Sequence, residues 1–386
     1  MNDVRQHFPG VLRQTYLNAA AQSLLPTPVM EEMSDSMRAH NELGINAFAS
    51  YLDGLIRARS AGARLLGARP EQIAFVGNTA AAISQVAGGI DWNDGDEILV
   101  GDEEFPAIVL PWLAQQPRGA RVRFVPTEEG RLLADRFLEA IGPRTRVVAV
   151  SHVQWTSGYC MELEELGRVC AEREILFCVD AIQSLGVLPI DVEKLKIGVL
   201  AADGRKWMMG PQGCTLLYVS DDWGRELRPP AVGTMTLANP DGLLDYRDWD
   251  RENGVVDMEP HLQAGAARFE TGFHNFCGLA GLARAMEFAE TVGRERIQTH
   301  IAQLTRLAAK TVQERGWTVW GPHQDHERAG ITTFSIPGDP TLVYDHLNRN
   351  DISISLREGR LRIAPHVYNT EDEVLHCIAT IQEALR

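Results

Sequence analysis

The chain has 386 residues, of which 45% are hydrophobic and 23% charged, so it can build a large core. The formal net charge of −15 argues against nucleic acid as a partner, because no basic surplus exists to neutralise phosphates. No apolar stretch reaches about 18 residues and the first residues lack the apolar segment of a secretion signal, so we expect neither a membrane span nor export. The six cysteines are scattered without metal-ligand spacing, which favours reduced thiols, a cytoplasmic protein and no metal.

The predicted elements alternate between strands and helices over the first part of the chain. After an arm of residues 1–14, apolar runs predict strands at 16–21, 73–76, 97–100, 121–126, 146–152, 175–180, 197–202 and 214–219. Helical spacing predicts helices at 29–66, 80–89, 105–115, 132–141 and 162–174. This alternation indicates an α/β protein with a mostly parallel sheet and helices on both faces.

After residue 219 the pattern changes. Residues 221–256 are rich in Asp, Pro, Gly and Trp, and we expect an irregular excursion, for which a subunit interface is one interpretation. A long helical segment near 276–315 then leads to strands at 317–320, 331–336, 352–355 and 361–364 and helices at 340–349 and 371–385. We therefore expect a large domain at 15–287 and a smaller α+β domain built from 1–14 and 288–386.

One lysine stands in an unusual setting. Lys206 follows a buried strand and lies between Gly204 and Gly210, where apolar neighbours would desolvate it. Desolvation disfavours the ammonium ion and lowers the pKa, as a Schiff-base lysine requires. The same position also fits a loop lysine whose ammonium group reaches water. Asp180, at the end of another strand, decides between the two, because pyridoxal 5'-phosphate (PLP) requires a lysine amine and an acid that faces its pyridinium nitrogen.

Further polar or aromatic side chains follow predicted strands. Residues 77–80 join a strand to a helix, where free backbone N–H groups and the Thr79 hydroxyl could bind an anion; a plain helix cap without a ligand is the alternative. Ligands of parallel sheets bind beyond the carboxyl ends of the strands. The candidates at that edge are Thr79, Phe105, His152, Gln154, Asp180 and Lys206.

Six segments together resemble one known family. They are Y-L-N-A-A at 16–20, G-N-T-A-A at 77–81, V-D-A-I-Q-S at 179–184, G-R-K-W-M-M-G-P-Q-G at 204–213, R-F-E-T-G at 268–272 and R-I-A-P-H-V-Y-N-T at 362–370. These motifs are similar to those of the class V aminotransferase group of fold-type-I PLP enzymes, which includes cysteine desulfurases, cystine C–S lyases and isopenicillin N epimerase. The resemblance covers nearly the whole chain and implies a PLP-dependent transferase fold with a seven-stranded type of sheet, in a homodimer with shared active sites.

The resemblance implies roles for several residues toward the cofactor. Lys206 would form the internal aldimine and move the α-proton, Asp180 would keep the pyridine nitrogen protonated, and Gln183 would bind the phenolic oxygen. The remaining expected cofactor contacts are Asn78, Thr79, Ala80, Phe105, Gln154, Asp203, Arg205, Gly272 and Phe273. Three departures stand out in this set. Phe105 replaces a stacking His, and Asp203 and Arg205 replace a small hydroxyl residue and a His. The loop of Gly272, Phe273 and His274, which would reach the neighbouring subunit's phosphate, lacks its usual Thr.

The resemblance also implies a substrate with a free α-carboxylate, which Arg362 would bind through its two-pronged guanidinium group. Arg357 and Arg360 are rivals for that role, because the three arginines lie close together in the sequence. The expected substrate contacts are Asn18, Trp155, His274, Arg357 and Arg362.

One feature of the desulfurases is missing. They carry a nucleophilic Cys on a loop before the carboxylate-binding Arg, whereas residues 357–362 read R-E-G-R-L-R without loop or Cys. We therefore expect a lyase or transferase that acts on an L-amino acid through Lys206, with an α,β-elimination of the C–S lyase type first. Transamination and epimerisation remain alternative reactions. An aminotransferase of class I or II on the same fold remains an alternative family. The intact pair of Lys206 and Asp180 argues against a non-catalytic binding protein on the same fold.

Overall fold

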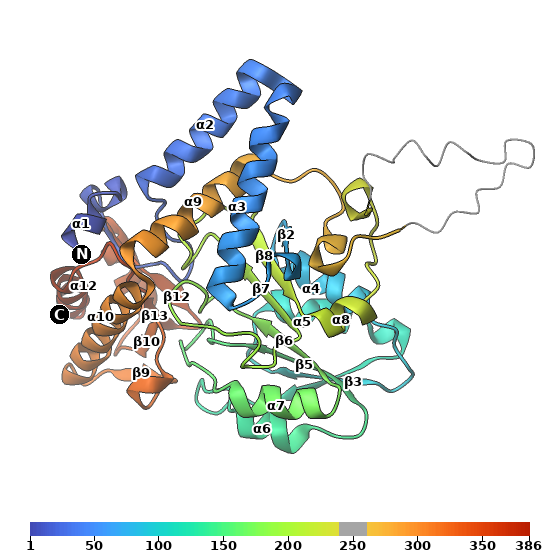
Figure 1. The fold of residues 1–386 in the computed structure, drawn as a ribbon. Helices are drawn as coiled ribbons and strands as arrows, with labels where there is room; N and C mark the ends of the chain where they lie inside the picture. The colour runs from blue at the N-terminus through green and yellow to red at the C-terminus, as the bar shows by residue number, and fades with distance from the viewer. Residues whose placement is uncertain (239–260) are drawn as a thin grey trace, which may run out of the picture.

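A computed structural model describes residues 1–238 and 261–386 of the protein. A central sheet carries helices on both faces, a helical pair projects from the top of the view, and a second α+β region lies at the left (Figure 1). Both chain termini lie in that α+β region (Figure 1).

The central sheet has seven strands, as the family resemblance implies, in the order β2-β8-β7-β6-β5-β3-β4. These are β2 (Ile73–Val76), β8 (Thr215–Val219), β7 (Val199–Asp203), β6 (Leu176–Asp180), β5 (Thr145–Ser151), β3 (Glu97–Gly101) and β4 (Arg121–Val125). Only β8 runs antiparallel to its neighbours β2 and β7. All the other strands therefore point their carboxyl ends to one edge of the sheet.

The inner strands are apolar along their whole length because both of their faces are buried. In β6, Phe177 and Val179 join one core, whereas Leu176 and Cys178 join the core on the opposite face. This alternation follows from the two-residue period of a strand and explains why these segments read as continuous apolar runs.

Two helical layers cover the sheet. One core contains side chains from α3 (Phe48–Leu66), α6 (Ala134–Ala140), α7 (Glu164–Glu172) and α9 (Phe276–Val292), and the other from α4 (Thr79–Gly88), α5 (Pro106–Leu113) and the flank of α8 (Asp221–Glu226). The short 3-10 helices are η1 (Pro9–Leu12), η2 (Gly44–Ala47), η3 (Pro70–Gln72), η4 (Gln116–Arg118), η5 (Thr234–Thr236), η7 (Gly265–Phe269) and η8 (Asp325–Glu327).

Four predicted stretches differ from the observed elements. The helical stretch 29–66 is α2 (Thr27–Leu43) followed by η2 and α3, because Gly44 at φ +55° ends the first helix. Likewise Gly293 at φ +95° separates α9 from α10 (Arg294–Glu314). The predicted strand 16–21 shrinks to β1 (Thr15–Tyr16), which pairs with β11 (Ile352–Ser353). The predicted excursion 221–256 begins with α8, and its residues 239–256 lie outside the described part of the chain.

The C-terminal α+β region has a core of its own. Its sheet has the order β12-β13-β10-β9 and consists of β9 (Thr318–Trp320), β10 (Thr332–Ser335), β12 (Ser355–Arg357) and β13 (Arg360–Ile363). Helices α10, α11 (Pro340–Arg349) and α12 (Glu371–Ala384) pack around it. The N-terminal helix α1 (Asn2–Arg5) joins this region, because Arg5 pairs with Glu373 at 2.8 Å and Phe8 packs on Tyr368.

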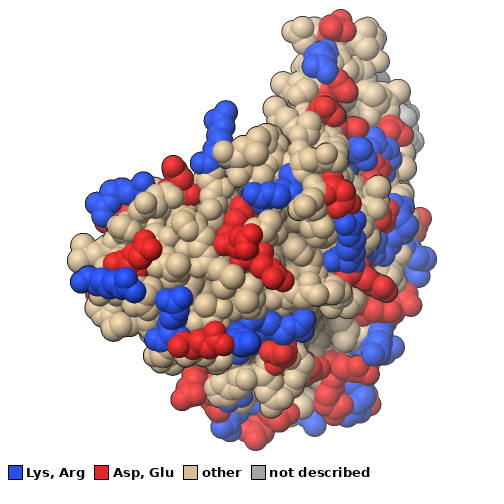
Figure 2. All heavy atoms as spheres, turned by 90° about the vertical axis from the view of Figure 1, so that its left-hand side faces the viewer, with Lys and Arg blue, Asp and Glu red and all other residues tan. Residues whose placement is uncertain are grey.

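On the face shown in Figure 2, basic and acidic side chains are interspersed among uncharged ones. Within residues 1–238 and 261–386, no helix combines the length and the hydropathy that a bilayer span requires.

Candidate active site

A cavity of about 180 Å³ lies at the carboxyl-terminal edge of the central sheet. Ten of the residues expected at the site line it: Asn78, Thr79, Ala80, Phe105, Trp155, Asp180, Gln183, Asp203, Arg205 and Lys206. They come from the ends of β2, β6 and β7 and from the loops after β3 and β5. The sheet edge therefore brings together residues that span nearly 130 positions of the sequence.

The turn that carries Lys206 is held by its glycines. The N–H of Gly210 donates to the carbonyl of Gly204 at 2.8 Å, which closes the loop around Lys206. A Cβ on Gly204 or Gly210 would lie 2.6 or 2.7 Å from Leu282 Cδ1, so a larger residue at either position would have to displace the buried Leu282 side chain. The loop therefore holds Lys206 at the cavity wall.

Lys206 and Asp180 favour each other's charged forms in this cavity, whereas burial disfavours both charges. Burial lowers the pKa of Lys206, and the nearby charges of Arg362 and Arg205 act in the same direction, while Asp180 opposes the shift. Burial raises the pKa of Asp180, although its hydrogen bond from Ile182 N (2.9 Å) and the charge of Lys206 counteract this. An amine that loses its proton readily thus lies near a buried acid.

The first turn of α4 offers an anion site. Asn78 is the N-cap, because its side chain accepts a hydrogen bond from Ala81 N at 2.8 Å. The hydroxyl of Thr79 is therefore not needed as a cap, and it is buried without a hydrogen-bond partner among the described residues. A buried hydroxyl beside free helix N–H groups suits a phosphate group.

Gln183 is fixed from both sides. Its Oε1 accepts from Trp207 Nε1 at 2.9 Å, and its Nε2 donates to the carbonyl of Ala20 at 3.0 Å. The indole of Trp207 in turn stacks on His366, with ring centroids 5.5 Å apart. The residue after Lys206 therefore positions Gln183 in the cavity wall.

Asp203 and Arg205 pair with each other. The N–H of Arg205 donates to Asp203 Oδ1 at 3.0 Å, and the guanidinium Nη1 lies 4.0 Å from Oδ2. Thr215 Oγ1 also donates to Asp203 Oδ2, at 3.3 Å. These contacts neutralise a carboxylate that would otherwise repel an anion at the same cavity.

An aromatic pair forms the rim of the cavity, with Phe105 and Trp155 in an edge-to-face arrangement at 5.3 Å. Arg362 lies behind this rim, where Nη1 donates to the Trp155 carbonyl and Nη2 to Ser355 Oγ at 3.3 Å. Arg362 is only 2% exposed, and burial lowers its pKa, with the charge of Arg357 adding to the shift. Its Nε has no hydrogen-bond partner among the described residues, so this cation can still accept an anionic ligand.

Asn18 lies behind Arg362 and does not line the cavity. Its Oδ1 accepts from Ser355 Oγ at 2.6 Å, and its Nδ2 donates to the Ile354 carbonyl at 3.1 Å. Ser355 is also a hydrogen-bond partner of Arg362. Asn18 therefore helps to position the Arg362 guanidinium group through their shared partner Ser355.

Two of the expected strand-end residues point away from the cavity. Ser151, Val153 and Trp155 line it, so the alternation of an extended chain turns His152 and Gln154 to the other side. His152 lies 3.5 Å from Cys160 Sγ, and burial lowers the pKa of its imidazole to about 4. The side chain of Gln154 is directed to a neighbouring carboxylate.

That carboxylate is Glu104, which the sequence analysis missed. Its oxygens accept from the N–H and the hydroxyl of Ser151 and from Gln154 Nε2. Burial raises the pKa of Glu104 to about 7, and the nearby charge of Asp180 contributes to the rise. The acidic run 102–104 directly after a predicted strand could have indicated this residue. A carboxylate at the end of a buried strand is often buried and hydrogen-bonded, not exposed to solvent.

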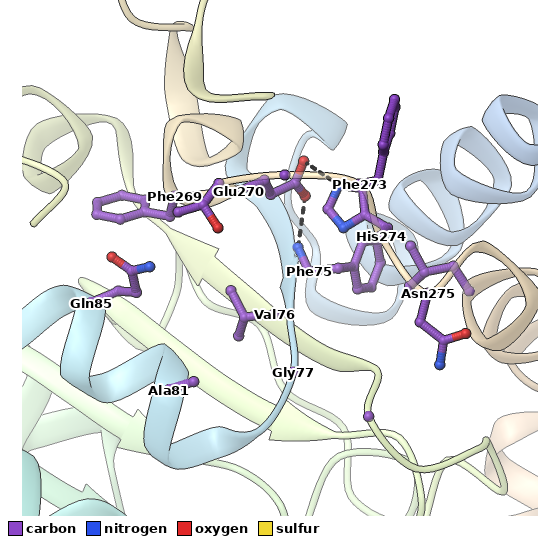
Figure 3. A pocket seen from close by; sticks show the side chains of 14 residues that line it. Phe75, Val76, Gly77, Ala81, Gln85, Phe269, Glu270, Phe273, His274 and Asn275 are labelled. Atoms are coloured by element: carbon purple, nitrogen blue, oxygen red, sulfur yellow. Dashed lines mark hydrogen bonds and ion pairs between the residues drawn. The ribbon is translucent and has the colours of Figure 1, made fainter. Parts of the chain in front are cut away.

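The loop of Gly272, Phe273 and His274 lines a different cavity, of about 350 Å³ (Figure 3). There His274 Nε2 lies 3.1 Å from Glu270, which also accepts from Phe75 N at 2.8 Å (Figure 3). The Phe273 ring points away from this pair and is 73% exposed (Figure 3). Within one chain, none of these three loop residues lines the cavity of Lys206.

Known proteins resemble this chain over its whole length. A family model described as aminotransferase class-V matches residues 15–374. A probable cysteine desulfurase of Methanothermobacter thermautotrophicus is 30% identical over 405 residues, which cover 99% of this chain and 97% of that protein. The isopenicillin N epimerase of Amycolatopsis lactamdurans is 28% identical over 387 residues, with 96% of this chain and 94% of that protein covered.

Solved structures share the fold. The apo cysteine desulfurase of Thermococcus onnurineus NA1 gives a TM-score of 0.88 at 27% identity, covering 99% of this chain and 97% of the other. The cystine C–S lyase C-DES in complex with its reaction product cysteine persulfide gives 0.86 at 26% identity, with 97% and 98% covered. A C-DES variant with glycine covalently linked to its PLP cofactor gives 0.87 at 26% identity, with 98% of both chains covered.

The residues of the cavity fit PLP. Lys206 offers the amine for its aldehyde, Asp180 the carboxylate for its ring nitrogen, and the start of α4 with the free Thr79 hydroxyl a site for its phosphate. The six cysteines, in contrast, do not line this cavity.

Proposed function

The chain belongs to the class V aminotransferase family of PLP-dependent enzymes, and from this premise we propose that it catalyses an α,β-elimination on an L-amino acid. The reaction is of the C–S lyase type and uses no persulfide-forming cysteine. The observation that carries the proposal is the joint placement of Lys206 and Asp180 in a cavity that no thiol lines.

The residues of the cavity have separate tasks in this reaction. PLP, when bound, would supply an electron sink that acidifies the α-proton of the substrate. The amine of Lys206 removes that proton and returns it toward the leaving group, which is favoured because burial lowers its pKa. Asp180 holds a proton at the ring nitrogen, and Arg362 binds the α-carboxylate.

The segment before Arg362 supports a reaction without a cysteine nucleophile. Strands β12 and β13 are joined directly by Glu358 and Gly359, which both have positive φ, at +49° and +73°. Such a two-residue turn leaves no room for a cysteine-bearing loop. Burial raises the pKa of each of the six cysteines, and a thiol that keeps its proton is a poor nucleophile.

The proton-transfer groups available favour elimination over epimerisation. Inversion by two bases needs a second acid or base on the opposite side of the α-carbon, and Phe105 at the cavity rim cannot transfer a proton. Transamination remains the second candidate, because it requires the same lysine and the same acid. The two reactions differ in their products.

A panel of amino acids assayed for pyruvate, ammonia, keto acid and α-deuterium exchange separates these functions. Elimination releases ammonia and a keto acid in equal amounts from a β-substituted alanine, without an added keto-acid acceptor. Keto-acid formation that depends on an acceptor and releases no ammonia would contradict elimination and favour transamination. Inversion with α-deuterium uptake in the recovered amino acid would favour an epimerase.

A second copy of the chain is the proposed partner of an apolar surface near α2. Ile45 and Phe273 are each 73% exposed, and Met37 is 58% exposed. They border an apolar cavity of about 350 Å³ whose wall includes Phe48 and Phe276. This surface continues into the cavity of Figure 3, which adjoins the first turn of α4. A homodimer would cover it and bring the loop 272–274 toward the partner's cofactor site.

Two further assignments belong to this proposal. The division into a large domain, 15–287, and a small domain, 1–14 with 288–386, is supported on its C-terminal side by the separate core of that region, which Leu17 also joins. A cytoplasmic location is supported by the six cysteines, which form no disulfide.

A further inference from the structure

The hairpin of β12 and β13 presents several cations on one face. Across it, Ser355 is paired with Arg362 and Arg357 with Arg360. Directly opposed residues share a face of a sheet, and so do residues two apart along a strand. Ser355, Arg357, Arg360 and Arg362 therefore all lie on the same face, on a hairpin whose tight turn fixes their register.

That face is turned toward the mouth of the cofactor cavity. Arg362 donates to the carbonyl of Trp155, and Trp155 lines the cavity. In the neighbouring strand β10, Thr333 pairs with Arg362 and donates to the carbonyl of Thr156. The hairpin thus covers the segment that forms the cavity rim.

The three arginines of this face have no ion pair with any described carboxylate. The guanidinium of Arg360 is placed over the Trp320 ring, 4.0 Å from its centroid. Arg357 is exposed, donates only to the carbonyl of Leu356, and lies near enough to Arg362 to lower its pKa. Two like charges that lie close together, one of them buried, favour the binding of anions between or beside them.

The acidic groups near the hairpin do not neutralise the charge of its arginines. Burial raises the pKa of Glu103, and the charges of Asp102 and Glu358 act in the same direction. The charge of Arg360 opposes them. Arg360 thus lies near both an aromatic ring and acidic charge, whereas the hydrogen bond of Arg357 goes to a neutral carbonyl group.

We propose that Arg357 binds a second anionic group of the substrate, so that the enzyme selects amino acids with a carboxylate in the side chain. In this arrangement Arg362 binds the α-carboxylate and Arg357 the side-chain carboxylate. The inference rests on the proposed function, because it requires that an amino acid occupies the cavity beside Lys206.

The test compares matched amino acids on the PLP-loaded enzyme, by titration of the cofactor's absorbance. Aspartate is paired with asparagine, and glutamate with glutamine, so that only the side-chain charge differs. The wild type should bind each acid at least about tenfold more tightly than its amide, and Arg357→Gln should remove that preference while changing amide binding by less than about twofold. Arg306→Gln, an exposed arginine on α10 far along the chain from the hairpin, serves as the matched control and should retain the preference.

Two results would overturn the inference. Equal weakening of acids and amides in Arg357→Gln would mean that Arg357 shares the α-carboxylate with Arg362. A wild type that binds acids and amides alike would mean that no second anion site exists. Failure of the proposed function looks different, because then no amino acid of the panel would change the absorbance, and the inference would fall with it.

Discussion

Replacing Glu104 by glutamine should stabilise the protein more at high pH than at low pH. The Glu104 carboxyl is buried and accepts hydrogen bonds only from neutral groups, on Ser151 and Gln154. Burial raises its pKa from 4.5 to about 7. Glutamine has the same shape and no charge to bury, and Ser151 can reverse its hydroxyl to accept from the new amide.

The sign and size follow from proton linkage. The folded state binds the Glu104 proton more tightly than the unfolded state, so the free energy of unfolding falls as pH rises toward the folded pKa of about 7. With these two pKa values, the wild type loses about 2.5 kcal/mol between about pH 5 and pH 8, and the variant does not. An unfolding entropy of about 0.8 kcal/mol/K for a chain of this length converts this into about 3 °C of melting temperature.

The assay is thermal unfolding of wild type and Glu104→Gln at several pH values, with the same cofactor loading and protein concentration. The melting temperature of the variant minus that of the wild type should rise by about 3 °C from about pH 5 to pH 8. Glu31→Gln, which removes an exposed carboxylate on α2, is the control and should give a flat difference. A difference in melting temperature between Glu104→Gln and wild type that stays the same at every pH would refute the reasoning.

Three further predictions concern the thiols, the dimer and the cavity wall. Each single Cys→Ala variant should keep turnover within about threefold of wild type, because none of the thiols lines the cavity; complete loss in any one would contradict the reaction without persulfide. Phe273→Glu should shift the mass measured by analytical ultracentrifugation toward the monomer, since it charges an exposed ring at the proposed interface; an unchanged mass would place the interface elsewhere. Trp207→Phe should weaken PLP binding about tenfold and shift its absorbance, because Gln183 loses the indole donor; an unaltered spectrum and affinity would show that this hydrogen bond does not position Gln183.

The sheet and the two central groups of the site could be read from the sequence. Continuous apolar runs identified strands that are buried on both faces, and Lys206 and Asp180 follow two of them. Because parallel strands deliver their carboxyl ends to one edge, residues far apart in sequence could be assigned to one site.

Other features could not be read in this way. Helical periodicity continues across Gly44 and Gly293, so the breaks there depend on a backbone conformation that spacing does not reveal. The segment after β5 was predicted to contribute His152 and Gln154, but alternation directs its odd-numbered residues into the cavity instead. Glu104 was missed because its role depends on a partner, Ser151, that lies 47 residues away.

The central claim is that Lys206 holds the cofactor, and the chain allows an unusually direct test. The sequence contains four lysines, at positions 194, 196, 206 and 310, and the three other than Lys206 are exposed. Borohydride reduction of the PLP-loaded protein followed by peptide mass mapping should find the reduced cofactor on Lys206 alone, and Lys206→Ala should abolish the label while Lys196→Ala retains it. A label on another lysine, or none on any, would contradict the account.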